Sequence, residues 1–264
     1  MSVLATFADR SSAKFSLAAV PAPSENGFSD SLMRLLDRLD CRHPDSGEAR
    51  QAIFRLRYQA YRRAGAIEPH ISKSFSDPYD EMANAYLFGV YLDDELASSI
   101  RIHVVSKNHP RSPSVDAFRD ILQPEIDAGK TIVDPSRFVT DEKLSRLHRG
   151  LPYITTRLCW LAARYFRAEH LLAAVRAEHQ AFYRRVFNHR MICGPRAYPG
   201  LTKPLCLMTT HHPTAAEGVH RRYPFFRSSF SERRLLFERE RSQTSLVAKP
   251  TPATFQPELK AAGA

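Results

Sequence analysis

The sequence predicts an α+β fold, in which helices pack against a central mixed β-sheet. In the first half, residues 85–92 and 96–105 are predicted strands, and Asp93-Asp94-Glu95 between them predicts a hairpin. In the second half, strand-like and helix-like segments alternate from residue 131 onward. With 264 residues, of which 43% are hydrophobic, the chain is long enough to bury a sizeable core.

Local signals predict the individual elements. Residues 30–43 are expected to hold a helix that leads into the first strand. Asp45 at the N-cap and Glu48 at position N3 form a capping-box pattern, which predicts a helix that runs to about Ala64 and ends at Gly65. A loop over 66–82 precedes the hairpin. The remaining expected elements are strands at 131–139, 171–176, 189–193 and 204–210, and helices within 108–129 and at 152–167, 179–187 and 229–241.

Three regions are expected along the chain: a flexible tail over 1–29, a folded domain over 30–212 and a basic C-terminal extension over 213–264. The tail is rich in Ser, Ala and Pro, a composition typical of disorder. No stretch approaches 18 consecutive apolar residues, so no transmembrane segment is expected. The longest apolar run near the N-terminus, Leu17 to Val20, is too short for a secretory signal. We therefore expect a cytoplasmic protein.

The net charge of +10 favours an acidic partner, which could be nucleic acid, anionic lipid or an acidic protein. The sequence has no helix-turn-helix, zinc or aromatic RNA-binding motif, so no nucleic acid is expected. The four cysteines show neither CxxC nor zinc spacing, which predicts reduced thiols and no metal site. A non-enzymatic basic module remains an alternative, and residues 225–241 would be its best candidate segment.

Polar residues interrupt the predicted strands. In strand 96–105, Ser99 and Arg101 share one face, which could meet solvent or line a cleft. Strand 131–139 contains Pro135, which predicts an edge or a bulge; a bulge would leave a backbone N–H free to bind a substrate carbonyl. Asp134 and Arg137 flank this point, and an ordinary surface ion pair is the alternative interpretation.

Charged residues could form a network around this strand. Arg57 lies on the apolar stripe of the first long helix, where it either extends to solvent or meets a carboxylate. The possible partners of Arg57, Arg101 and Arg137 are Asp77, Asp80 and Asp134. Such a network contributes little if it is exposed, and must be well paired if it is buried.

The segments 54–61, 76–80, 99–101 and 134–138, in this order and spacing, resemble the autoinducer synthases that make N-acyl-homoserine lactones. They resemble the related N-acyl amino acid synthases at least as closely. Residues 179–187 are similar to the fourth helix of the N-acetyltransferase (GNAT) fold on which both families are built. The resemblance covers about 50–210. It implies a GNAT-like acyl-CoA N-acyltransferase fold and an acyltransferase activity.

Departures from these families bear on the substrates. Autoinducer synthases have Trp and Glu where this chain has Ile67 and Asp134, which favours an amino acid over S-adenosylmethionine as the acceptor. Residues 140–151 hold a single glycine, Gly150, unlike a pyrophosphate-binding loop. We therefore expect acyl carrier protein as the donor, with acyl-CoA as the alternative, and no bound cofactor. The basic residues expected to meet the acidic carrier protein are Arg146, Arg149, Arg164 and Arg167.

The resemblance implies acyl transfer from a thioester to the α-amine of an amino acid or a related small molecule. Asp134 would accept the ammonium proton, Arg101 would be a second catalytic residue, and Tyr183 would protonate the leaving thiolate. The acyl chain would lie where strands 131–139 and 171–176 separate. The other expected substrate-binding residues are Arg57, Tyr61, Asp77, Asp80, Ser99, Arg137 and Phe138. A lactone synthase that uses S-adenosylmethionine remains the alternative enzyme, and acyl length and oligomeric state stay open.

Overall fold

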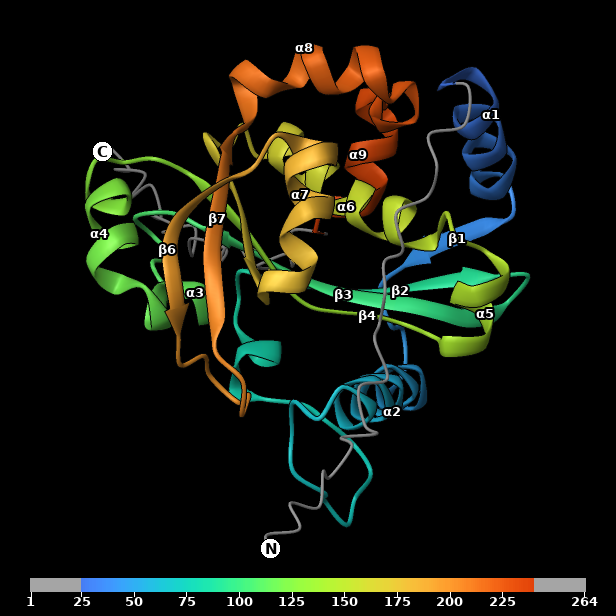
Figure 1. Cartoon of the computed structure of the whole chain (residues 1–264), viewed down its shortest axis with the longest axis horizontal. Coiled ribbons are helices and arrows are strands. Elements are labelled where there is room, and N and C mark those ends of the chain that lie inside the picture. Colours follow the sequence, from blue (N-terminus) through green and yellow to red (C-terminus); the bar gives the residue numbers. More distant parts are fainter. Residues whose placement is uncertain (1–24, 240–264) are drawn as a thin grey trace, which may run out of the picture.

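The computed structural model of the chain describes residues 25–239, and within them seven strands form one mixed sheet (Figure 1). The strand order is β1-β2-β3-β4-β5-β7-β6, and neighbours are antiparallel except for the parallel pair β4 and β5. This confirms the predicted mixed sheet. The strands are β1 (Leu39–Arg42), β2 (Ala85–Leu92), β3 (Glu95–Val105), β4 (Ile132–Thr140), β5 (His170–Val175), β6 (Arg190–Arg196) and β7 (Leu205–His211).

Helices cover both faces of the sheet (Figure 1). One face packs against α2, and the other carries α6 with the C-terminal α8 and α9. No helix in the described part of the chain is long and apolar enough to span a membrane. The helices are α1 (Glu25–Leu36), α2 (Gly47–Arg63), α3 (Pro113–Ala117), α4 (Arg119–Asp127), α5 (Glu142–Leu147), α6 (Leu151–Tyr165), α7 (Gln180–Phe187), α8 (His212–Arg222) and α9 (Phe230–Phe237).

Helix α2 begins one residue later than the capping-box pattern predicts. Its N-cap is Ser46, which has an extended backbone and whose hydroxyl accepts a hydrogen bond from the N–H of Ala49 at 3.2 Å. The expected N-cap, Asp45, is therefore wrong, and Glu48 sits too early in the helix to complete the box. The buried stripe of α2 consists of Ile53, Phe54, Leu56 and Arg57.

Strands β4 and β5 separate soon after they meet. They pair only at Ile132 with His170 and at Val133 with Leu171. Further along β4, Arg101 pairs with Ser136 but Ser99 pairs with Val139, so two residues of β4 oppose Ile100. This is the predicted bulge, and it is confirmed. Because a bulge bends its strand, it directs β4 away from β5 and opens a gap in the middle of the sheet.

The C-terminal residues that the structure describes complete the main core. Phe225, Phe226 and Phe237 pack in the same apolar cluster as Trp160 of α6. Helix α8 was not anticipated, because its sequence is polar apart from a few small residues, although its early proline is a typical start signal. Helix α1 begins before residue 30, and the expected tail before residue 25 and the segment after residue 239 lie outside the described residues.

Truncation of Phe237 tests whether α9 belongs to the core. Its side chain is 2% exposed, so Phe237→Ala leaves a cavity, and we expect a loss of about 3–5 kcal/mol in the free energy of unfolding. Phe230 lies on the same helix but is 63% exposed, so Phe230→Ala serves as the matched control and should change stability by less than about 0.5 kcal/mol. Urea unfolding measures both values. Equal effects would show that α9 does not pack as described.

Candidate active site

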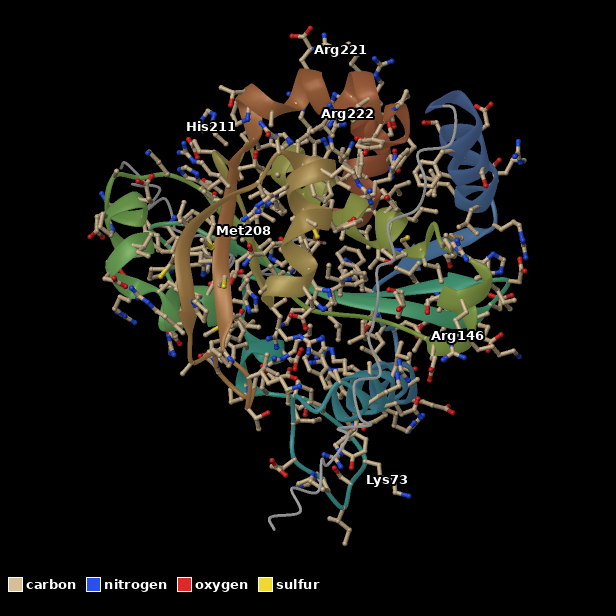
Figure 2. All side chains as sticks on the ribbon, in the orientation of Figure 1. Lys73, Arg146, Met208, His211, Arg221 and Arg222 are labelled. Atoms are coloured by element: carbon tan, nitrogen blue, oxygen red, sulfur yellow. The ribbon has the colours of Figure 1, made fainter. Side chains whose placement is uncertain are left out.

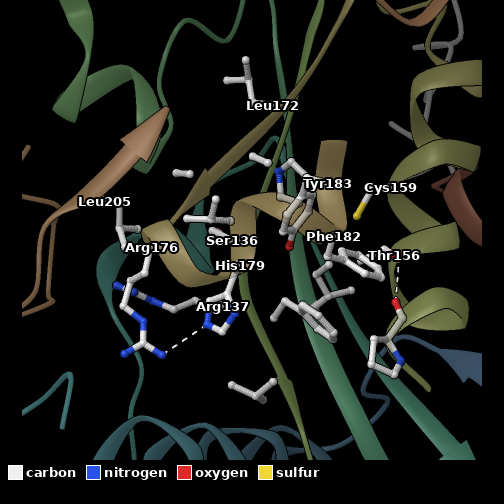
Figure 3. Close-up of a pocket in the computed structure, with 18 of the residues that line it drawn as sticks. Ser136, Arg137, Thr156, Cys159, Leu172, Arg176, His179, Phe182, Tyr183 and Leu205 are labelled. Atoms are coloured by element: carbon white, nitrogen blue, oxygen red, sulfur yellow. Dashed lines mark hydrogen bonds between the residues drawn. The ribbon is translucent and has the colours of Figure 1, made fainter. Parts of the chain in front are cut away.

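A cavity of about 240 Å³ occupies the gap between β4 and β5 (Figure 3). It lies where the sequence predicted that the two strands would separate. Its wall is mostly apolar, as a site for an alkyl chain requires. The lining includes Ala60, Tyr61 and Ala64 of α2, Pro135 to Thr140 of β4, Thr156 and Cys159 of α6, Leu171 to Val175 of β5, and Phe182, Tyr183 and Phe187 of α7.

Two tyrosine hydroxyls belong to the cavity wall. Tyr61 comes from α2 and Tyr183 from α7, so they reach the cavity from opposite faces of the sheet. Neither hydroxyl has a hydrogen-bond partner among the described residues. Burial raises the pKa of Tyr183, and nearby Cys159 and Tyr61 raise it further. Tyr183 is therefore a protonated phenol that can donate a hydrogen bond or a proton to a bound molecule.

One edge of the cavity is basic. An N–H of Arg176 donates to Nε2 of His179 at 3.2 Å, and both residues line the cavity (Figure 3). Burial and the charge of Arg176 lower the pKa of His179, so this imidazole is neutral and carries its hydrogen on Nδ1. Lys203 also lines the cavity. This edge can therefore receive the polar or anionic part of a substrate.

A chain of alternating charges leads from α2 to the cavity. Arg57 Nη1 donates to Asp80 Oδ1 at 2.8 Å, and Arg101 Nη1 lies 3.0 Å from the same oxygen. Arg101 also bonds Asp77 at 2.5 Å, and Arg137 donates to Asp77 through Nε at 2.9 Å and Nη2 at 2.6 Å. The side chains of all five are at most 11% exposed. The expected pairing with Asp77 and Asp80 is confirmed.

The polar face of β3 points into the interior of the protein. Ser99, Arg101 and His103 are fully buried against α2 and the 3-10 turn Pro78–Glu81, so this face does not meet solvent. The Ser99 hydroxyl has no hydrogen-bond partner, and the same holds for Nε and Nη2 of Arg57 within the described part of the chain. The interior therefore holds polar donors that protein groups leave unsatisfied.

The network keeps its two carboxylates ionised. Burial alone would raise the pKa of Asp77, but hydrogen bonds and charges of Arg101 and Arg137 outweigh it and lower the value to about 2. The pKa of Asp80 is lowered in the same way by Arg57 and Arg101. Because these folded-state values lie below the unfolded ones, the stabilisation is present above the ordinary carboxyl pKa and is lost as the pH falls towards about 2.

Asp134 lies outside this network and does not line the cavity. Its carboxylate accepts hydrogen bonds from the N–H of Ser114 at 3.1 Å and from the Ser114 hydroxyl at 2.6 Å. Burial raises the pKa of Asp134, although the hydrogen bonds from Ser114 and Ser112 oppose the rise. The structure therefore does not bring Asp134 together with Arg137 as an ion pair, the pairing considered for it.

The expected residues fall into two groups. Tyr61, Arg137, Phe138 and Tyr183 line the cavity, whereas the remaining ones lie behind its wall. Ser136 belongs to the expected segment 134–138 but had no role of its own; it lines the cavity, and its hydroxyl accepts a hydrogen bond from Arg101 Nε at 3.1 Å. Its position opposite Arg101 in the β3–β4 pair accounts for this contact, and that register is not visible in the local sequence. No group of His, Cys, Asp and Glu in the described residues could hold a metal ion.

Comparison with known proteins agrees with this architecture. The family model described as N-acyl amino acid synthase FeeM matches residues 52–211. The solved structure of FeeM, an N-acyl amino acid synthase from uncultured soil microbes, aligns with a TM-score of 0.57 and 18% identity over 68% of this chain and 94% of that chain. The acyl-homoserine-lactone (AHL) synthase LasI aligns with a TM-score of 0.49 and 16% identity over 68% and 93%, respectively. A search of curated proteins finds no match.

Neutralisation of Asp80 tests the buried network. Asp80→Asn leaves Arg57 and Arg101 buried with too few carboxylates, and we expect a loss of about 3–5 kcal/mol in the free energy of unfolding. Asp93→Asn is the control, because its pair with Arg38 is more than half exposed and should be energetically almost silent. Chemical denaturation of both variants near neutral pH gives the comparison. A stable Asp80→Asn variant would contradict the described network.

Proposed function

Because the chain belongs to the FeeM family of N-acyl amino acid synthases, we propose that this acyltransferase moves a fatty acyl group from a thioester to the α-amine of an amino acid. The observation that carries the proposal is the apolar cavity between β4 and β5, whose wall also presents Arg137 and the hydroxyl of Tyr183. An alkyl chain fits the apolar part of the wall. The reaction takes place where the polar groups meet it.

The bulge in β4 is suited to hold the thioester carbonyl. Arg137 and Phe138 line the cavity at the point where two residues oppose one, and the additional residue leaves a backbone N–H outside the strand ladder. That N–H would stabilise the negative charge that develops on the carbonyl oxygen during attack. Tyr183 would then protonate the departing thiolate, because burial keeps its phenol in the protonated form.

The charge of the buried network favours an acceptor that carries a carboxylate. Three guanidinium groups face two carboxylates in it, which leaves an excess of one positive charge. Arg137 brings that excess to the cavity wall. An amino acid with an uncharged amine bears one negative charge and would balance it. S-adenosylmethionine has an additional positive charge, so it fits less well than an amino acid.

The surface at α5 favours acyl carrier protein as the donor. Lys143, Arg146 and Arg149 are exposed there, with the 66%-exposed Leu147 among them, on the segment that connects the lining residues Thr140 and Pro152. Three basic side chains around one exposed apolar side chain are complementary to the surface of an acidic protein. Figure 2 shows Arg146 at this edge, away from Arg221 and Arg222 of α8.

The other two basic residues expected at the donor surface lie elsewhere. Arg164 is in the last turn of α6 and Arg167 lies two residues beyond its end, whereas Arg149 precedes its start; the helix has 15 residues and is therefore about 22 Å long. A single docking surface would hold Arg146 and Arg149 but not this second pair. Substitution of Arg146 and Arg149 can therefore test the docking surface, and substitution of Arg164 and Arg167 can serve as the control.

The decisive experiment offers the purified protein an acyl carrier protein thioester together with each of the common amino acids. Mass spectrometry should detect an N-acyl amino acid that is absent without the enzyme. The proposal would be contradicted if no amino acid were acylated. It would also be contradicted if S-adenosylmethionine were the only amine accepted and the product were a lactone.

Charge reversal tests the donor surface. We expect Arg146→Glu combined with Arg149→Glu to lower kcat/KM for an acyl carrier protein thioester by about tenfold or more, because it removes electrostatic attraction to an acidic partner. The same variant should use acyl-CoA as the wild type does. Arg164→Glu combined with Arg167→Glu is the matched control and should leave both rates unchanged. Equal losses in the two double variants would argue against a docking surface at α5.

Removal of the Tyr183 hydroxyl tests the acid. Tyr183→Phe should slow release of an alkyl thiol by about 100-fold or more, which a thiol-reactive dye reports. An aryl thioester, whose thiolate needs no proton to leave, should be affected much less. Tyr86→Phe is the control, because Tyr86 is buried but does not line the cavity. Equal losses with the two donors would rule out proton donation by Tyr183.

A further inference from the structure

The described cavity wall contains no carboxylate that could take a proton from an incoming ammonium. The two histidines that line it are poor bases. Burial lowers the pKa of His189 to about 3, and burial and the charge of Arg176 lower that of His179. An amine must nevertheless be uncharged before it attacks a thioester. The proton therefore needs a path to a base behind the wall.

A hydrogen-bonded chain connects Tyr198, Ser114 and Asp134. Ser114 Oγ lies 2.6 Å from Asp134 Oδ1, and because a carboxylate accepts only, the single hydroxyl hydrogen of Ser114 points to Asp134. The Tyr198 hydroxyl lies 3.2 Å from the same Ser114 oxygen and must then be the donor of that bond. The chain thus has one direction, from Tyr198 through Ser114 to Asp134.

Tyr198 lies just behind the cavity wall, near enough to Arg137 to influence the pKa of that guanidinium, and Arg137 lines the cavity. The carbonyl of Pro199 accepts a hydrogen bond from Arg137 Nη2 at 2.9 Å. A Cβ atom on Gly200 would come within 2.9 Å of the same nitrogen, and its positive φ of 71° suits glycine, so the close contact depends on that residue. Pro199 and Gly200, the residues that follow Tyr198, therefore lie directly against the guanidinium that we assign to the acceptor carboxylate.

We propose that Tyr198, Ser114 and Asp134 form a proton relay that deprotonates the acceptor. The inference rests on the proposed function. The ammonium gives one proton to the Tyr198 oxygen, the Tyr198 proton passes to Ser114, and the Ser114 proton passes to the carboxylate of Asp134. The nitrogen lone pair then attacks the thioester carbon, the C–S bond breaks, and the thiolate leaves. Of the two protons that the ammonium loses, Asp134 takes one and the thiol takes the other by way of Tyr183.

The environment of Asp134 suits a terminal acceptor. Burial raises its pKa, which makes the carboxylate a stronger base than an exposed one. Burial also raises the pKa of Tyr198, so a free phenolate is disfavoured and the protons must move together. The charged or titratable groups that face Asp134 are Arg101, Tyr198, Cys159 and, directly across the β3–β4 pair, His103. Burial lowers the pKa of His103 to about 3, so it stays neutral.

Removal of the Tyr198 hydroxyl breaks the relay at its outer end. Tyr198→Phe should lower kcat for amide formation with an amino acid by about 100-fold, with little change in the KM of the acceptor. Asp134→Asn should cost a similar factor. Because both act on one pathway, the double variant should be no slower than the worse single variant, whereas independent structural defects would multiply. Tyr153→Phe is the control, since that hydroxyl is similarly buried but accepts a hydrogen bond from Arg185 and has no contact with Ser114.

Two further readouts separate proton transfer from a packing defect. Methoxyamine is uncharged at neutral pH and needs no deprotonation, so Tyr198→Phe should acylate it at nearly the wild-type rate. In the wild type, kcat with an amino acid should fall as the pH drops through the raised pKa of Asp134, and this acid limb should disappear in Asp134→Asn. Ser114→Ala, which keeps the backbone hydrogen bond to Asp134, should reproduce Tyr198→Phe.

The possible failures are distinct. If the wild type acylates amino acids but Tyr198→Phe is equally fast, or is slow with methoxyamine as well, the relay is wrong while the proposed function stands. If the wild type transfers no acyl group to any amino acid, the proposed function is wrong and the relay falls with it.

Discussion

The carboxylate of Asp77 fixes the shape of the centre of the sheet. It joins Arg101 of β3 to Arg137 of β4, on the two strands that the bulge disturbs. Arg137 has a positive φ of 54°, a conformation that costs an ordinary residue about 1–3 kcal/mol. Asp77, the carbonyl of Pro199 and the ring of Phe75, 4.6 Å from the guanidinium, together hold it there. The bulge, the gap after it and the orientation of the Arg137 side chain therefore depend on the buried cluster of Asp77, Arg101 and Arg137.

This arrangement places the buried ion cluster next to the cavity, because Arg137 belongs to both. The cavity interrupts the sheet between β4 and β5, so the two halves must be held together elsewhere. Helix α6 does this from one face, since it contacts β3, β4 and β5, and the C-terminal α9 covers α6 in turn. The buried Arg157 of α6 bonds Glu232 of α9 and the carbonyls of Phe225 and Arg227. The C-terminal residues thus support the part of the sheet where β4 and β5 are no longer paired.

The sequence could predict the parts that follow from local pattern. Alternation in β3 placed Ser99 and Arg101 on one face, and Pro135 indicated the bulge in β4. The charge count indicated a network, but the assignment of Asp77 and Asp80 depends on a loop that folds back onto β3, which no local pattern encodes. Asp134 shows the limit most clearly, because its hydrogen-bond partner Ser114 lies 20 residues earlier on a short helix, and Asp134 does not line the cavity. Helix α8 has too weak an apolar stripe to be distinguished from a loop.

Charge balance couples the relay to the identity of the acceptor. With Asp134 ionised, the three arginines and three carboxylates of the region sum to zero. Once Asp134 takes up a proton, the protein contributes one uncompensated positive charge in a buried site, a state that is costly without an anion. The carboxylate of an amino acid at Arg137 supplies that anion, and the molecule that gives up the proton is the one that carries it. An amine without a carboxylate would leave the charge unbalanced after proton transfer. In the proposed reaction, selection of the acceptor and its activation would therefore follow from the same electrostatic constraint.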